Sequence, residues 1–132
     1  MDIALCVLDQ DQKRIQYTGA MNDLIYITDE KLNVINADKS SVCAFFDNSG
    51  SFTMKEINYK KGDIFYLFSD GYQDQFGGDF HKKFLYKYFR LTLFEIHKFP
   101  LSDQKKILEG KLHEWMKVQD QTDDITVMGI RL

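Results

Sequence analysis

The chain has 132 residues, a net charge of −3 at pH 7, 44% hydrophobic residues and 14% aromatic residues. This length and composition predict one folded domain with its own core and exclude an intrinsically disordered chain. The acidic balance argues against nucleic acid as a partner, and no apolar run approaches the roughly 20 residues that a membrane-spanning helix needs.

The two cysteines, Cys6 and Cys43, lie far apart in apolar surroundings and match no metal-binding spacing. We therefore expect both to be reduced packing residues, which is typical of a cytoplasmic protein. The N-terminus also lacks the basic segment that opens a secretory signal peptide. The chain is accordingly expected to act in the cytoplasm, without a membrane segment.

The first half of the chain predicts short strands joined by polar turns. Residues 3–8 have no polar face, which predicts a strand covered on both sides. The short turns predict hairpins in a largely antiparallel array. The other predicted strands cover residues 14–18, 24–28, 32–35, 52–58 and 64–68, and residues 38–50 are expected to form a loop.

The hydrophobic period changes after Gly78. Apolar residues from Leu85 to Ile96 fall at helical spacing, and Pro100 ends this predicted helix. A second helix is predicted to begin with Ser102 as its N-cap and to carry one apolar face up to residue 116. A polar connector, residues 119–124, then leads into a last strand at residues 125–130, which is apolar on both faces.

Acidic residues occur at the ends of two predicted strands. Asp70 follows the strand at 64–68, whereas Asp123 and Asp124 precede the last strand. If these strands are antiparallel neighbours, the three carboxylates meet at one edge of the sheet. Hard oxygen ligands of this kind suit Mg²⁺ or Mn²⁺. The alternative interpretation is an ordinary turn and a solvated loop. Close backbone approach or positive φ is expected at Gly71, Gly77 and Gly78.

Other polar residues have weaker functional interpretations. His81, His97 and His113 share no ligand spacing, so packing or surface roles are favoured. Asp74 and Asp79 flank the glycine turn and could contact metal-bound water. The favoured interpretation is that both are solvated acids of a turn.

A basic cluster and several aromatic residues have functional and structural interpretations as well. The cluster is suited to a phosphorylated partner, but a solvated helix face is the favoured interpretation. Trp115 and the aromatic residues of the first helix are expected in the core rather than at a ligand site. The basic cluster consists of Lys82, Lys83, Lys87 and Arg90.

Three stretches of the sequence together resemble a known family. "GDIFYLFSDGYQDQFGG" is followed by "QTDDITVMGIRL", with "IQYTGAMNDLIYI" upstream. They are similar to the C-terminal two thirds of the serine phosphatase domain of the stage II sporulation protein E type, a group of metal-dependent type 2C protein phosphatases. The resemblance implies an α+β fold, a layered antiparallel β-sandwich with flanking helices, whose N-terminal part is missing. Residues 1–132 would then form one partial domain with no second domain.

The resemblance also implies a metal site. Asp70 and Asp123 stand where the family has metal ligands, whereas Asp124 occupies a position less suited to coordination. In the complete family domain two Mn²⁺ or Mg²⁺ ions activate a water that attacks a phosphoserine or phosphothreonine of a protein substrate. No protein nucleophile or other catalytic side chain is implied.

One departure from the family pattern concerns the first metal-binding segment. This segment, an Asp followed by Gly-His-Gly, has no counterpart, because the sequence contains no Gly-His dipeptide. Weak or single-ion binding and impaired turnover in bacterial signalling are therefore expected. Apolar sheet surface left exposed would favour a homodimer. The alternative is a non-catalytic interaction module that retains the phosphatase fold. A further departure, Asp23 in place of a common proline, leaves the resemblance intact.

Overall fold

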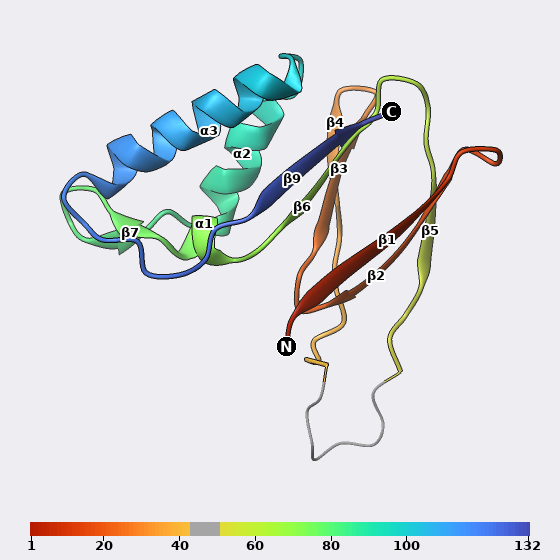
Figure 1. The fold of residues 1–132 in the computed structure, drawn as a ribbon, viewed down its shortest axis with the longest axis horizontal. Helices are drawn as coiled ribbons and strands as arrows, with labels where there is room; N and C mark the ends of the chain where they lie inside the picture. The colour runs from red at the N-terminus through yellow and green to blue at the C-terminus, as the bar shows by residue number, and fades with distance from the viewer. Residues whose placement is uncertain (43–50) are drawn as a thin grey trace. The chain divides into compact units, whose positions relative to one another are not determined.

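The computed structural model describes residues 1–42 and 51–132 (Figure 1). The chain divides into two compact units, residues 1–68 with 128–132 and residues 69–127. The first unit contains two antiparallel sheets, and the second contains the longer helices and a two-stranded hairpin. Cys43 and most of the loop expected at residues 38–50 lie outside the described residues.

Most of the predicted elements are present in the structure. The strand expected at residues 52–58 is shorter than predicted, and a single helical turn and a small hairpin appear between the last strand of the first half and the first long helix. These extra elements are too short to produce a periodic pattern. In chain order the elements are β1 (Ile3–Asp9), β2 (Arg14–Ala20), β3 (Leu24–Thr28), β4 (Lys31–Ile35), β5 (Lys55–Asn58), β6 (Ile64–Phe68), α1 (Gly71–Asp74), β7 (Phe76–Gly77), β8 (Lys82–Lys83), α2 (Tyr86–Ile96), α3 (Leu101–Met116) and β9 (Val127–Arg131).

The first unit is a sandwich of two sheets, with strand orders β1-β2-β5 and β4-β3-β6-β9. Its core contains Ile15, Tyr17 and Ile57 from the first sheet, packed with Leu24 and Phe65 from the second. The antiparallel pairings place alternate residues on the inner faces, as the period of two requires. The α+β class with a layered antiparallel sandwich is confirmed.

Strand β1 differs from its expected environment. Ile3, Leu5 and Val7 have 36%, 55% and 52% of their surfaces exposed, whereas Ala4 and Cys6 pack against the core. The prediction of a strand covered on both faces is therefore wrong. Among the described strands β1 lies at the edge of its sheet, and only one of its faces meets the other sheet. Burial raises the pKa of the Cys6 thiol to about 11.

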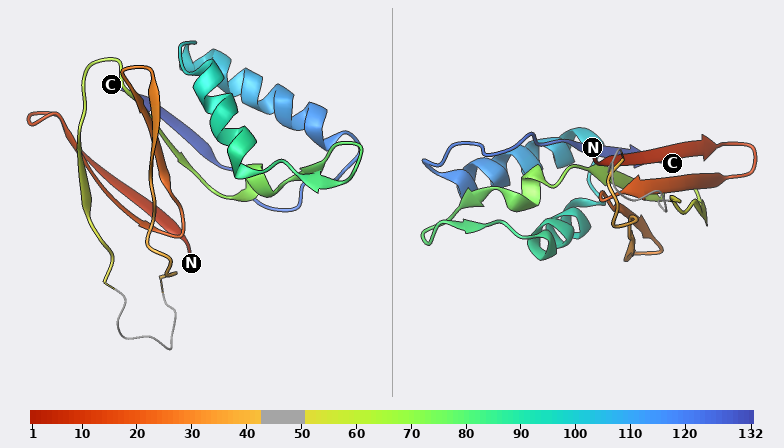
Figure 2. Two further views of the ribbon diagram at one scale, coloured as in Figure 1. Left: turned by 180° about the vertical axis from the view of Figure 1, so that it is seen from behind. Right: turned by 90° about the horizontal axis from the view of Figure 1, so that it is seen from below.

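In the second unit α2 and α3 form a helical hairpin (Figure 2). Phe89, Leu93 and Ile96 are buried along one face of α2. The turn between the helices is held by Gln104, whose Nε2 donates hydrogen bonds to the carbonyls of His97, at 3.1 Å, and Phe99, at 2.9 Å. No helix within residues 1–42 and 51–132 is both long and apolar enough to cross a membrane.

The start of α3 corrects the expected N-cap. Pro100, not Ser102, is the N-cap, because the Pro100 carbonyl accepts the backbone N–H of Gln104 at 3.0 Å. Its φ of −54° and ψ of 146° form the extended entry that an N-cap needs. Pro100 thus opens α3, whereas α2 already ends at Ile96, before the proline.

Candidate functional site

The ends of β6 and β9 meet as the sequence predicts. The strands are neighbours in one sheet. The backbone N–H of Ser69 donates to the Thr126 carbonyl at 3.0 Å, and that of Leu132 donates to the Asp63 carbonyl at 3.0 Å. Residue numbers therefore rise along one strand as they fall along the other, so the pair is antiparallel. The segment that contains Asp70 consequently lies beside the segment that precedes β9.

Ser69 and Gly71 join these two segments closely. The Ser69 hydroxyl donates to the Asp124 carbonyl at 2.9 Å and accepts the Thr126 N–H at 3.0 Å. Gly71 is buried, and a Cβ added there would lie 3.0 Å from the Asp124 carbonyl carbon. The close approach expected for Gly71 is confirmed, since only hydrogen fits at this point. Asp70, between them, is exposed and begins α1.

The acidic residues before β9 form the other side of this edge. Asp123 and Asp124 are exposed, and Asp123 Oδ1 accepts the Asp124 N–H at 2.7 Å. Together with Gln121 and Thr122 they line a concavity of about 370 Å³. Its oxygen-rich surface is open to a ligand from solvent.

The donor chemistry of this edge fits a hard divalent cation. Carboxylates of Asp70 and Asp123 and nearby carbonyl oxygens are the ligand types that Mg²⁺ and Mn²⁺ prefer. The number of donors is small, because the described part of the chain contains no group of three or more His, Cys, Asp or Glu side chains able to hold a metal. The assignment of Asp70 and Asp123 as ligands stays a prediction.

Gln75 is a residue of this region that sequence reasoning missed. It follows α1, and its side chain is fully buried. Its Nε2 donates to the Asp120 carbonyl at 2.9 Å, and its Oε1 accepts the Thr122 N–H at 3.2 Å. A single polar residue between an acid and an aromatic residue carries no periodic signal, so burial revealed it only in the structure.

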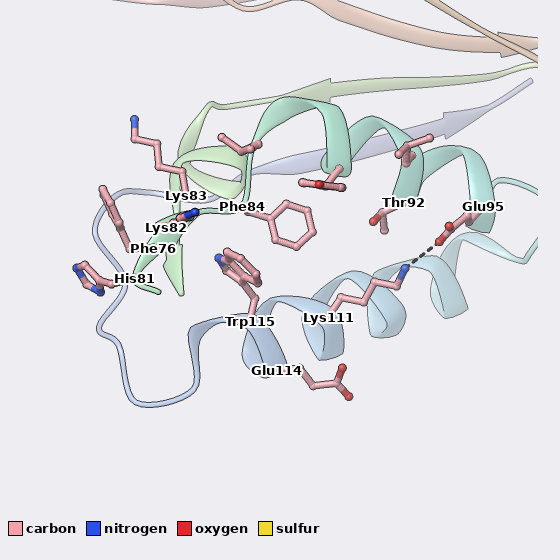
Figure 3. A pocket seen from close by; sticks show the side chains of 13 residues that line it. Phe76, His81, Lys82, Lys83, Phe84, Thr92, Glu95, Lys111, Glu114 and Trp115 are labelled. Carbon is pink, nitrogen blue, oxygen red and sulfur yellow. Dashed lines mark hydrogen bonds and ion pairs between the residues drawn. The ribbon is translucent and has the colours of Figure 1, made fainter. Parts of the chain in front are cut away.

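A groove of about 1250 Å³ is another concavity of the second unit (Figure 3). Phe84 and Trp115 meet edge to face in it, with ring centroids 5.6 Å apart. Trp115, expected in the core, is only partly buried, and Tyr88 is exposed, although Phe89 is buried as predicted. Gly78 has the positive φ that was expected, +67°, and packs against the Trp115 ring.

Charged groups around this groove pair with one another. Lys83 Nζ lies 2.7 Å from Asp74 Oδ2. Lys111 Nζ lies 2.9 Å from Glu95 Oε2, the pair marked by the dashed line in Figure 3. Lys82 lies over the Phe80 ring instead. The predicted basic cluster is therefore spread over β8 and α2 rather than along one helix face.

The remaining candidates occupy ordinary structural positions. Asp79 pairs with Lys117, whose hydrogen bond holds the pKa of the Asp79 carboxyl below its usual range. His81 stacks on Phe76 with ring centroids 5.1 Å apart. Neither contact favours a role at the acidic edge.

Comparisons with known proteins agree with this fold. The family model of stage II sporulation protein E (SpoIIE) matches residues 1–132. The SiaA-PP2C domain of Pseudomonas aeruginosa is similar with a TM-score of 0.91 and 25% identity, over 99% of this chain and 51% of that chain. The SpoIIE phosphatase domain of Bacillus subtilis, soaked with Mn, gives a TM-score of 0.71 and 13% identity, over 99% and 56%.

The chain thus spans about half the length of these solved chains. No curated protein matches it. At 13% identity the Bacillus subtilis domain supports the fold alone. The family model, in contrast, matches every residue, including both acidic segments. The chain belongs to the stage II sporulation protein E (SpoIIE) family.

Proposed function

We propose that this chain takes part in metal-dependent hydrolysis of phosphoserine or phosphothreonine on a protein substrate in bacterial signalling. The observation that carries the proposal is the hydrogen-bonded junction of Ser69 with Asp124 and Thr126. It brings the segments of Asp70 and Asp123, 53 positions apart in sequence, to one strand edge. Membership in a family with the phosphatase fold supports the same reaction.

Asp70 and Asp123 are the residues that would hold Mn²⁺ or Mg²⁺. Such ions, when bound, acidify a coordinated water and offset the charge of the transferring phosphoryl group. The chain's own contribution is to place two exposed carboxylates where a phosphorylated side chain of another protein can reach them. With so few ligands we expect one weakly bound ion and little turnover, whereas a complete domain would hold two.

Replacement of Asp70 by Asn tests the metal site. Mn²⁺ affinity is measured from the electron paramagnetic resonance signal of the free ion during titration. We expect Asp70→Asn to weaken Mn²⁺ binding at least about tenfold. Mutation of a residue that only supports a metal ligand already lowers metal affinity by about this factor. Asp79→Asn removes an exposed acid of the same unit and should leave the affinity unchanged. Absence of Mn²⁺ binding by the parent chain, or equal losses in both variants, would contradict the proposed site.

The second candidate function is a non-catalytic interaction module with the phosphatase fold. The lack of a three-ligand group among residues 1–42 and 51–132 favours it. Mn²⁺-dependent release of phosphate from a phosphoserine peptide, lost in Asp70→Asn, would support the enzyme. Mn²⁺ binding without any release would support the module.

We also propose a second copy of the chain as a partner and the cytoplasm as its location. The exposed apolar side chains of Ile3, Leu5 and Val7 lie on a strand that, among the described strands, has a neighbour on one side only. Such an edge offers apolar surface and backbone hydrogen-bonding groups to another copy. Cys6 is a free thiol, which agrees with a reducing compartment.

A further inference from the structure

Gln75 connects the two sides of the acidic edge. It lies in the chain just after the Ser69–Gly71 turn, and its side chain reaches the connector of residues 119–124. Its amide nitrogen donates to the Asp120 carbonyl at 2.9 Å and to the Phe76 carbonyl at 3.1 Å. Its amide oxygen accepts the Thr122 N–H at 3.2 Å. One side chain therefore binds the connector through both a donor and an acceptor.

Because Gln75 is buried, its side-chain amide depends on these hydrogen bonds. A buried amide without partners costs free energy, so the connector is held where the amide is satisfied. The connector has little packing of its own, because Asp120 to Asp124 are exposed. Its position next to Asp70 therefore depends on Gln75 at one end and on Ser69 at the other.

The backbone of Gln75 is itself fixed by neighbouring elements. Its carbonyl accepts the Trp115 Nε1–H at 3.0 Å and the Phe84 N–H at 3.0 Å. These bonds tie it to the end of α3 and to the segment after β8. Gln75 is thus bonded through its backbone to two other elements and through its side chain to the acidic connector.

We propose that Gln75 is a positioning residue, which sets the place of Asp123 relative to Asp70. Its significance for metal binding rests on the proposed function. The hydrogen-bonding role itself concerns the connector and can be measured without a metal. Gln75 touches neither acidic side chain in the contacts that the structure gives it, so it acts through the connector backbone.

The test compares Gln75→Met with Gln104→Met in the full chain. Both glutamines are buried, at 0% and 2% exposure, and each donates to two backbone carbonyls of the same unit. Methionine has a similar length but cannot make these bonds. Gln104 holds the α2–α3 turn, so its variant controls for general loss of stability.

Two measurements separate positioning from folding. Hydrogen exchange of the peptide covering residues 119–124 should become about tenfold faster in Gln75→Met and stay unchanged in Gln104→Met, since of the two glutamines only Gln75 bonds to this segment, where it accepts the Thr122 N–H. Mn²⁺ affinity, from the same resonance titration, should fall about tenfold in Gln75→Met alone.

Each outcome decides the proposal. Unchanged exchange in Gln75→Met, or equal acceleration in both variants, would overturn it. If the parent chain binds no Mn²⁺, the proposed function fails, and the exchange result alone decides the role of Gln75. If Gln75→Met does not fold, exchange of the Thr122 amide in the parent decides, because an unprotected amide would mean that Gln75 does not hold the connector.

Discussion

Ser69 and Gly71 join the acidic segments by different physical means. Ser69 contributes a hydroxyl that both donates and accepts across the junction, whereas Gly71 contributes only the absence of a side chain. Asp70 lies between them and is therefore held on both sides. At this scale the site depends on neighbours that carry no metal-binding chemistry.

Replacement of Gly71 by Ala tests this close approach. The added methyl group would press on the Asp124 carbonyl, so we expect the free energy of unfolding to fall by about 1–3 kcal/mol. Gly110→Ala is the control, since an added Cβ there meets no atom within 4 Å and α3 should gain about 0.5–1 kcal/mol. Urea denaturation followed by Trp115 fluorescence measures both. A Gly71→Ala variant as stable as the parent would contradict the predicted contact.

Helix α1 depends on tertiary packing rather than on its own stability. It has four residues, too few to persist alone. Tyr72 anchors it, because its ring packs against Phe84 and Phe89 and its hydroxyl donates to the Leu108 carbonyl of α3 at 2.9 Å. The turn that carries Asp70 is consequently positioned by the helical hairpin.

Replacement of Tyr72 by Phe removes this hydrogen bond and keeps the ring. We expect a loss of about 0.5–1.5 kcal/mol in the free energy of unfolding. Tyr88→Phe, at an exposed position of α2, should change it little. Urea denaturation distinguishes the two variants. Equal stability of Tyr72→Phe and the parent would mean that the buried hydroxyl does not support α1.

The same variant predicts a change in pH dependence. Burial raises the pKa of Tyr72 in the folded chain, whereas the unfolded chain ionises at its ordinary value, about 10. The contribution of Tyr72 to the free energy of unfolding is therefore complete below about pH 10. It is lost as the pH rises further, because the unfolded chain then releases the tyrosine proton more readily than the folded chain. Tyr72→Phe should lose less stability than the parent above this pH.

At the scale of the whole molecule, we expect the exposed face of β1 to promote self-association. Leu5 and Val7 lie on an edge strand, with more than half of each side chain exposed. Edge strands with apolar side chains tend to pair with other chains unless charges block them. Asp9 is the acidic residue of this strand, and it lies at the strand's end beside Arg14.

We expect the parent chain to self-associate with rising concentration, as measured by analytical ultracentrifugation. Leu5→Lys should weaken association at least about tenfold, because burial of a leucine side chain contributes about 1.5–3 kcal/mol and 1.4 kcal/mol corresponds to a factor of about ten. Val118→Lys, at an isolated exposed residue, is the matched control. A parent that stays monomeric at all concentrations would contradict the proposed partner.

Most elements could be predicted because their signals are local in the chain. Alternation predicted β2, short apolar stretches between polar turns predicted β3, β4 and β6, and helical spacing predicted α2 and α3. Each of these patterns depends on residues within a few positions. The meeting of the segments of Asp70 and Asp123 was also predictable. Each acidic segment adjoins one end of a strand, and these two strands are antiparallel neighbours, so the two ends lie at the same edge of the sheet.

The sequence by itself thus determined most of the elements, the family and the two acidic segments. Only the tertiary structure decided that β1 exposes one apolar face, that Trp115 lines a groove, and that Gln75 is buried beneath the acidic edge. The physical reason is distance along the chain. Gln75 bonds to residues 45 and 47 positions away, and no local pattern encodes such a contact.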